Sequence, residues 1–315
     1  MNRYVLTVTC NPAIDKTIKI DNFRLGLEHR FRDVYRSAGG KGVNVSQALK
    51  KVGIESLATG FLGGKSGEYI KEKLEEEGIQ TDFIRIKGET RTSLTIIDKK
   101  LKKTTRILEP GPTVNRKDII CFKKKFQSLL KQCFYVVFSG RNIPGASDSF
   151  YYDLIKLAEK QRKPAILDTS GKPLLLGIKA KPFLIKPNLK EAEYILGKKL
   201  NHVWKLRLAV KELLELGIEN VIISMGREGV VASDGRETWF AKPHRRKAIN
   251  PVGSGDALIG GFLYSKIKGK RFKEAVKIAV AAGTANALSV NPGEFKKKAV
   301  FDIAKSVKLN RYKLW

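Results

Sequence analysis

Cysteine is scarce and long apolar stretches are absent in this 315-residue sequence. Its three cysteines, Cys10, Cys121 and Cys133, are odd in number and have no metal-site spacing, which argues against a disulfide scaffold and a structural zinc site. No run of about 18 apolar residues occurs, so no membrane-spanning helix is expected. Residues 1–8 resemble a strand and contain no signal-peptide core, and we therefore expect a cytoplasmic protein.

Acidic residues are also scarce. Only 31 Asp and Glu stand against 61 Lys and Arg, which gives a net charge of +30. A field of this sign favours anionic partners such as nucleic acid, anionic lipid or phosphorylated metabolites. The basic residues occur in short runs that are not interleaved with aromatics, unlike a base-stacking surface. A solvated face is the simpler interpretation of each run.

The sequence has enough apolar residues, 42%, for a real core, which excludes a disordered chain. Short β-rich segments alternate with helical patterns, for example the strand 134–138, the helix 148–160 and the strand 165–167. Strands separated by helices of this length predict βαβ units and a mostly parallel sheet. No linker rich in Ser, Gly or Pro divides the chain, so we expect one domain over residues 1–315.

Two places break this alternation. Residues 17–20 and 32–35 resemble strands with no helix between them, and residues 93–97 and 104–108 resemble a hairpin. Two such pairs predict a small second sheet, inserted at about 17–36 and 91–108. Its exposed face would form a lid or a contact between two copies of the chain.

The first candidate motif is a glycine-rich segment, residues 38–44, that leads into a helix. Gly39 and Gly40 allow close approach of a ligand to the backbone, and a helix start offers free N–H groups to polar oxygens. Lys41 and Asn44 add donors. The spacing is not that of a Walker A loop. A plain turn before a helix remains the alternative.

The second motif, residues 250–257, also opens a helix. Gly253 and Gly255 flank Ser254 and offer backbone N–H groups to an anion. Asp256 lies in the first turn, where the positive end of the helix is expected to keep its carboxylate ionised. A carboxylate beside an anion site suits phosphoryl transfer to a hydroxyl group, because it can accept the hydroxyl proton. Taken alone, Asp256 could also be a simple helix N-terminal charge.

A third motif follows a strand at Lys186. Asn188 and Glu191 lie three residues apart at a helix start, so both can face one site. Oxygen ligands of this kind suit Mg²⁺, often through water. The same spacing is that of a capping box, and the residues alone do not decide between the two.

Weaker signals lie at other strand ends. A Gly-x-x-Gly turn at Gly226 and Gly229 could lie against a nucleotide, although a tight turn is the simpler interpretation. Asp15 could bind sugar hydroxyls, and Arg91 and Arg141 could bind a phosphate through their guanidinium groups. In so basic a chain, each single arginine can equally be a surface residue.

Taken together, these segments resemble the phosphofructokinase-B group of ribokinase-like sugar kinases. The resemblance runs from about residue 7 to about residue 293, and the pair of glycine-rich motifs, Gly39–Asn44 and Gly253–Asp256, is its most specific part. It implies a three-layer α/β/α fold with a mostly parallel central sheet and a small β-sheet lid. Residues 88–91 and 107–112 are most similar to tagatose-6-phosphate kinases, with 1-phosphofructokinases next. The loop after Ser139 and the position of Cys10 depart from the usual pattern.

The resemblance also implies roles for individual residues. Asp256 would be the catalytic base, with Gly253, Ser254 and Gly255 as the anion hole. Asn188 and Glu191 would govern Mg²⁺. The positions near ATP would be Lys186, Asn188, Ser224, Gly226, Gly229 and Asn286, and the positions that bind the sugar phosphate would be Asp15, Gly39, Gly40, Lys41, Asn44 and Arg91, with Arg141 as a possible addition.

The expected activity is therefore ATP-dependent phosphorylation of a ketohexose phosphate, tagatose 6-phosphate or fructose 1-phosphate, to the 1,6-bisphosphate. We expect Mg²⁺ as cofactor and a homodimer formed through the lid. One alternative is a kinase of an unphosphorylated sugar or nucleoside. A second alternative, from another class, is a nucleic-acid-binding protein on a kinase fold, which the charge motivates but the complete set of catalytic motifs disfavours.

Overall fold

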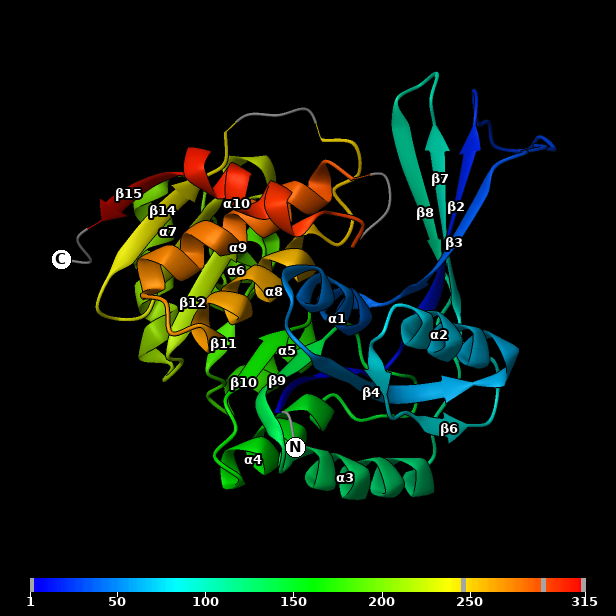
Figure 1. Ribbon diagram of the computed structural model, residues 1–315, viewed down its shortest axis with the longest axis horizontal. Coiled ribbons are helices and arrows are strands. Elements are labelled where there is room, and N and C mark those ends of the chain that lie inside the picture. Colours follow the sequence, from blue (N-terminus) through cyan, green and yellow to red (C-terminus); the bar gives the residue numbers. More distant parts are fainter. Residues whose placement is uncertain (1–2, 245–247, 290–292, 313–315) are drawn as a thin grey trace.

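Two β-sheets of different size organise the chain (Figure 1). The computed structural model describes residues 3–244, 248–289 and 293–312. The main sheet has eleven strands: β1 (Tyr4–Thr9), β4 (Ser56–Gly63), β5 (Gln80–Thr81), β6 (Ile84–Ile86), β9 (Cys133–Ser139), β10 (Ala165–Asp168), β11 (Leu184–Ile185), β12 (Asn220–Ser224), β13 (Val230–Ser233), β14 (Thr238–Lys242) and β15 (Lys308–Tyr312).

Most of the main sheet is parallel, as predicted. Its order is β15-β14-β13-β12-β11-β10-β9-β1-β4-β5, and β6 also pairs with β4. All pairs from β12 to β5 are parallel, whereas β13, β14 and β15 extend the sheet in antiparallel fashion. The carboxyl ends of the parallel strands therefore meet at one edge, where ligands of open α/β sheets bind.

Helices cover both faces of the main sheet, which confirms the expected α/β class. They are α1 (Lys41–Val52), α2 (Gly64–Glu76), α3 (Arg116–Leu130), α4 (Phe150–Lys160), α5 (Lys172–Ile178), α6 (Leu189–Leu196), α7 (Val203–Glu215), α8 (Ser254–Ile267), α9 (Phe272–Ala287) and α10 (Lys297–Ser306). One core packs residues of α3 to α7 against the sheet, and a second core does the same for α1, α8, α9 and α10.

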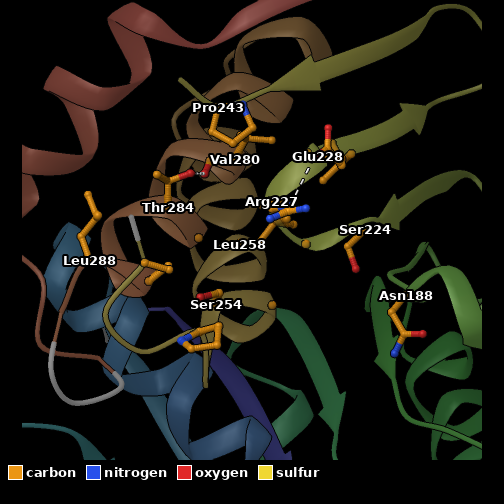
Figure 2. Close-up of a pocket in the computed structure, with 18 of the residues that line it drawn as sticks. Asn188, Ser224, Arg227, Glu228, Pro243, Ser254, Leu258, Val280, Thr284 and Leu288 are labelled. Carbon is orange, nitrogen blue, oxygen red and sulfur yellow. Dashed lines mark hydrogen bonds and ion pairs between the residues drawn. The ribbon is translucent and has the colours of Figure 1, made fainter. Parts of the chain in front are cut away.

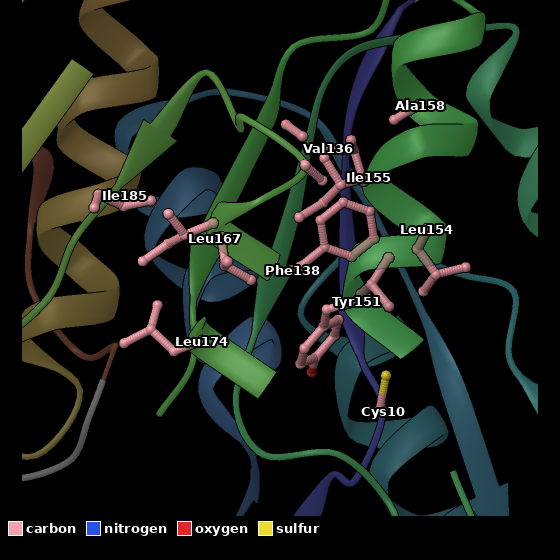
Figure 3. Close-up of a cluster of buried hydrophobic side chains, with 14 of the residues drawn as sticks. Cys10, Val136, Phe138, Tyr151, Leu154, Ile155, Ala158, Leu167, Leu174 and Ile185 are labelled. Atoms are coloured by element: carbon pink, nitrogen blue, oxygen red, sulfur yellow. The ribbon is translucent and has the colours of Figure 1, made fainter. Parts of the chain in front are cut away.

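Strand β9 illustrates why the central strands are apolar throughout. Val136 and Phe138 belong to the first core, and Val137, which points the opposite way, belongs to the second. Figure 3 shows Phe138 beside Tyr151 of α4, with ring centroids 5.8 Å apart, and Val136 near Ile155 of the same helix. Cys10, just beyond β1, is buried in the same cluster.

The small sheet contains β2 (Ala13–Ile20), β3 (Val34–Gly39), β7 (Thr92–Asp98) and β8 (Lys103–Leu108), in the order β3-β2-β7-β8. It projects from the body beside α1 and α2 (Figure 1). The two strand pairs predicted from the sequence are thus present, although β2 begins four residues earlier than expected and β3 ends four residues later.

Among the helices of the described ranges, none combines the length and the apolar character that spanning a membrane needs.

Close helix packing fixes the middle of α8 against its neighbours. Gly261 of α8 faces α9 so closely that a Cβ atom there would lie 2.8 Å from both the Cβ of Ala282 and the carbonyl oxygen of Ile278. Gly260 similarly faces Ala48 of α1 at 3.0 Å. These glycines let three helices meet at backbone distance.

Gly261→Val should therefore force α8 and α9 apart. Overpacking of this kind costs about 1–3 kcal/mol of unfolding free energy, measurable by urea denaturation. Lys298→Val, at an exposed position of α10, is the control and should change stability by less than about 0.5 kcal/mol. Equal stability of Gly261→Val and the wild type would contradict this account of the packing.

Candidate active site

The two glycine-rich motifs meet in space. The side-chain amide of Asn44, on α1, donates a hydrogen bond of 2.8 Å to Oδ2 of Asp256, on α8, across 212 residues of sequence. Both side chains are buried. Gly253 caps α8 in the left-handed conformation, with φ of 78°, so that the backbone turns sharply into the helix. The predicted base and one of the predicted sugar-binding residues thus form a single unit.

The start of α8 presents unused backbone donors. The N–H of Ser254 donates to the Pro251 carbonyl, and that of Ala257 donates to Gly253. Gly255 and Asp256 lie between these two residues, and within the described part of the chain their backbone N–H groups have no protein acceptor. They lie at the positive end of a 14-residue helix, an arrangement that binds anions.

A carboxylate that the sequence analysis missed completes this centre. Asp168 ends β10 and is buried, and its Oδ1 lies 3.3 Å from Nζ of Lys41 and 3.4 Å from Nζ of Lys186. The hydroxyl of Ser139 lies 3.3 Å from Oδ2 of the same carboxylate. The available signal was a single acid at the carboxyl end of a buried parallel strand.

The ionisation of Asp256 differs from the expectation that the helix N-terminus keeps it charged. Burial, and next the negative charge of Asp168, raise the pKa of Asp256 to about 7, although Lys41 and the hydrogen bond from Asn44 act in the opposite direction. The expectation considered the helix dipole alone, whereas burial and the neighbouring carboxylate act against ionisation of this carboxyl.

The opposite shift holds for the missed acid. Burial alone would raise the pKa of Asp168, but the charges of Lys186 and Lys41 outweigh it and lower that pKa below its ordinary value. Asp168 is therefore the more readily ionised member of the pair. Two neighbouring carboxyl groups with separated pKa values are a common feature of acid–base sites.

A pocket of about 770 Å³ opens on one side of this centre (Figure 2). Its walls include five of the six residues that were expected near the nucleotide, namely Lys186, Asn188, Ser224, Gly226 and Gly229. Leu258 of α8, Val280 of α9 and Leu288 just after α9 form the opposite, apolar wall. The pocket thus combines an apolar wall with polar groups close to the anion hole, as a nucleotide site requires.

Asn286 is the exception, because it does not line the pocket. Its amide donates to the Val252 carbonyl at 2.7 Å and to the Ser254 hydroxyl at 3.3 Å, and its Oδ1 accepts from the N–H of Gly293. The side chain is buried behind the loop that precedes α8. We therefore assign Asn286 to holding this loop in place.

Asn188 and Glu191 form the capping box that their spacing permits. Oδ1 of Asn188 accepts from the N–H of Glu191 at 2.9 Å, and Oε2 of Glu191 accepts from the N–H of Asn188 at 2.8 Å. Oε1 of Glu191 has no protein donor among the described residues, and Asn188 lines the pocket. The cap therefore leaves oxygen atoms that can serve a cation through water.

The small sheet contributes a separate charged cluster. The carboxyl of Asp15, on β2, occupies the space where a Cβ of residue 39 would be, which explains the glycine at Gly39. Burial raises the pKa of Asp15, whereas the nearby Arg106 and Arg91 lower it. Arg106, on β8, is a second residue that the sequence analysis missed, since nothing in a lone strand arginine distinguishes it.

Arg91 is held in place by the backbone around it. Its Nε and Nη2 both donate to the carbonyl of Asn11, at 3.2 and 3.1 Å. Burial lowers the pKa of Arg91; Asp15 raises it, and the guanidinium groups of Arg141 and Arg106 lower it further. Arg91 thus lies close to two other arginines and to the carboxylates of Asp15 and Glu109, which leaves an excess of positive charge for an anionic ligand.

Comparisons with known proteins agree with this geometry. Residues 8–299 match the model of the family described as pfkB family carbohydrate kinase. The chain is 35% identical to a tagatose-6-phosphate kinase of Staphylococcus epidermidis, over 97% of this chain and 99% of that protein. It is 36% identical to a 1-phosphofructokinase of Bacillus subtilis, over 92% of this chain and 94% of that protein.

A solved structure agrees as closely. The crystal structure of a possible 1-phosphofructokinase from Thermotoga maritima superposes with a TM-score of 0.91 at 30% identity, covering 98% of this chain and 100% of that one. The similarity therefore extends over the main sheet and the small sheet together.

The raised pKa of Asp256 has a consequence for stability. A carboxyl whose pKa is higher in the folded than in the unfolded state lowers the unfolding free energy as the pH rises between the two values, here between about 4 and 7. Asp256→Asn removes this loss. Its melting temperature relative to the wild type should therefore be higher at pH 8 than at pH 4.

Thermal melts of both proteins at the two pH values measure this difference. Asp148→Asn, which changes an exposed carboxyl, is the control for the loss of one negative charge at the surface. If the difference in melting temperature between Asp256→Asn and the wild type is the same at pH 4 and pH 8, the pKa of Asp256 is not raised in the folded protein.

Proposed function

The chain belongs to the pfkB family of carbohydrate kinases, and from that premise we propose that it transfers the γ-phosphoryl group of ATP to a ketohexose phosphate, tagatose 6-phosphate or fructose 1-phosphate, giving the 1,6-bisphosphate. The observation that carries this proposal is the Asn44–Asp256 unit. It places a carboxyl beside free N–H groups at the start of α8, between a nucleotide-sized pocket and the charged residues of the small sheet.

In this proposal Asp256 accepts the proton of the attacking hydroxyl group. A pKa of about 7 is well matched to proton transfer near neutral pH. The N–H groups of Gly255 and Asp256 receive the negative charge of the transferring group. Asn188 and Glu191 would hold Mg²⁺ through water, and the ion would neutralise phosphate charge when bound.

The three arginines support a substrate that already carries a phosphate. A phosphate offers three oxygens and about two negative charges, and arginine matches it with paired N–H donors. Asp15 lies near Arg91 and Arg106 and can accept hydrogen bonds from sugar hydroxyls, and Arg141 lies near Arg91. An unphosphorylated sugar or a nucleoside offers no anionic group to these cations.

A substrate panel tests the proposed function. ADP release is measured with tagatose 6-phosphate, fructose 1-phosphate, fructose 6-phosphate, fructose and adenosine, with Asp256→Asn as the variant that lacks the base. Turnover that is highest with one of the first two sugars supports the proposal. Turnover highest with fructose or adenosine, or none with any sugar, would overturn it.

Arg141 provides the clearest test of phosphate recognition. It is exposed, and within the described residues its guanidinium has no hydrogen bond or ion pair that its removal would break. Losing a charge-assisted contact of about 1.5–3 kcal/mol should raise KM for the sugar phosphate by about 10- to 150-fold in Arg141→Ala. KM for ATP should remain within about twofold.

The control is Arg236→Ala, another exposed arginine, in the turn between β13 and β14, which should leave both KM values unchanged. Arg91→Ala is a less selective probe, because it also releases the Asn11 carbonyl. Equal KM changes for ATP and the sugar phosphate in Arg141→Ala would mean that Arg141 does not recognise the phosphate.

We also propose that two copies of the chain associate through the small sheet. Every residue of β8 is exposed, and Ile107 and Leu108 expose 54% and 48% of their surface. Val34 and Tyr35 of β3, at the opposite edge, are exposed at 39% and 38%. Exposed apolar side chains on unpaired edge strands favour association.

Sedimentation velocity at micromolar concentration should therefore give a dimer. Ile107→Glu should shift it towards a monomer, because it places a charge in the apolar contact. Thr104→Glu, at another exposed position of the same strand, separates a local effect from a general effect of added charge. A wild-type monomer, with and without sugar phosphate, would contradict the proposal.

A further inference from the structure

Asp168 is a buried charged group that the proposed chemistry has not yet used. It stands at the carboxyl end of β10, and its side chain is 1% exposed. A single oxygen, Oδ1, faces the ammonium groups of both Lys41 and Lys186, at 3.3 and 3.4 Å. Burying a carboxylate with two cations on one oxygen costs desolvation energy, and a gain in stability alone does not explain it. The function of Asp168 is therefore to be sought in the two lysine side chains that it contacts.

The two lysines come from opposite sides of the centre. Lys186 follows β11, lines the nucleotide pocket, and carries its Nζ only 3.0 Å from where a Cβ of Gly255 would lie. Its ammonium group therefore stands directly over the anion hole. Lys41 begins α1, one turn before the Asn44 that binds Asp256.

Without a carboxylate between them, these ammonium groups would repel each other. The charges that face Asp256 are Asp168 from β10, Lys41 from α1 and Lys186 from the loop after β11, together with the neutral Asn44. Glu191 of α6 also acts on Lys41. Asp168 is the only one of these groups that contacts both lysines.

We propose that Asp168 is a positioning residue for phosphoryl transfer, which holds Lys41 and Lys186 together over the anion hole where the nucleotide pocket meets the sugar side. This rests on the proposed kinase function. The lysines then meet the phosphoryl group with their side chains already ordered, and binding does not have to supply that order.

Asp168→Asn keeps the shape of the side chain and removes its charge. Loss of the order that the carboxylate gives the two lysines should lower kcat by roughly 10- to 150-fold, the equivalent of one charge-assisted contact. Removing the negative charge beside Asp256 should also move the acid limb of the pH dependence of kcat to lower pH. A residue that only supports the fold would lower kcat or stability without moving that limb.

A matched control lies next to Asp168. Thr169→Val removes the 2.8 Å hydrogen bond from the Thr169 hydroxyl to the Gly140 carbonyl, at the same strand end, without any change of charge. It should leave the acid limb in place. An unchanged kcat in Asp168→Asn, or a lower kcat with an unmoved limb, would overturn the proposal.

A double variant separates position from stability. Asp168→Asn leaves the ammonium groups of Lys41 and Lys186 without their carboxylate. The double variant Asp168→Asn/Lys41→Met also lacks one of these two cations, so its melting temperature should be much closer to that of the wild type. Its kcat should remain below that of Lys41→Met alone. If Asp168→Asn alone does not fold, the double variant can still be compared with Lys41→Met. Equal kcat values in these two proteins would overturn the proposal.

A readout without substrate separates this proposal from the proposed function. Carboxyl ¹³C signals of labelled aspartate give the titration of Asp256 in the wild type and in Asp168→Asn. A shift of this titration to lower pH supports the role of Asp168, and an unmoved titration overturns it. Absence of wild-type turnover on every sugar of the panel would instead overturn the kinase proposal alone.

Discussion

The hydrogen bond between Asn44 and Asp256 is the contact on which the site depends. It joins helices α1 and α8, which begin at the two glycine-rich segments and pack closely along Gly260. Because both ends are buried, neither side chain can turn to water when the other is lost. The first turn of α8, the loop held by Asn286 and the start of α1 are therefore all defined relative to one donor and one acceptor.

Electrostatics divides this site into two parts with opposite requirements. Around Asp168 and Asp256, two acids and two lysines nearly balance, so the buried centre carries little net charge before a ligand binds. Around Asp15, the arginines exceed the acid. The buried part thus avoids the cost of an unpaired charge, whereas the half-open part keeps a field that attracts an anion.

The sequence predicted much of this architecture, because periodicity reports burial. The apolar run in β9, the helices α1, α4 and α8, and the four strands of the small sheet were all anticipated from local pattern. Helix α3 and the antiparallel end of the sheet around β15 were not, since α3 is rich in lysine and β15 is a short, mostly exposed edge strand. Local pattern carries little information where an element packs with only a few residues.

The sequence identified the glycine-rich motifs of the site, because their spacing is unusual. It did not predict how the surrounding charges and burial shift the pKa values of their side chains. The pKa of Asp256 depends on burial and on Asp168, which lies 88 positions earlier in the chain. Arg106 and Asp168 could not be recognised as site residues from the sequence, because only the folded sheets place them beside the other charged residues. Residue type and spacing therefore located the centre, whereas the strengths of its charges needed the fold.

The small sheet joins the body through four short crossings of the chain, and they converge near Asn11. The side chain of Asn11 donates to the Pro110 carbonyl, its own carbonyl receives Arg91, and Pro12 lies against Gly40. Four connections that meet near one point tie the sheet to the body at a single junction, and Ile14 and Ala38 at the base of the sheet also pack against the body. Arg91 lies at this junction, so an anion that it binds would contact the small sheet and the body at once.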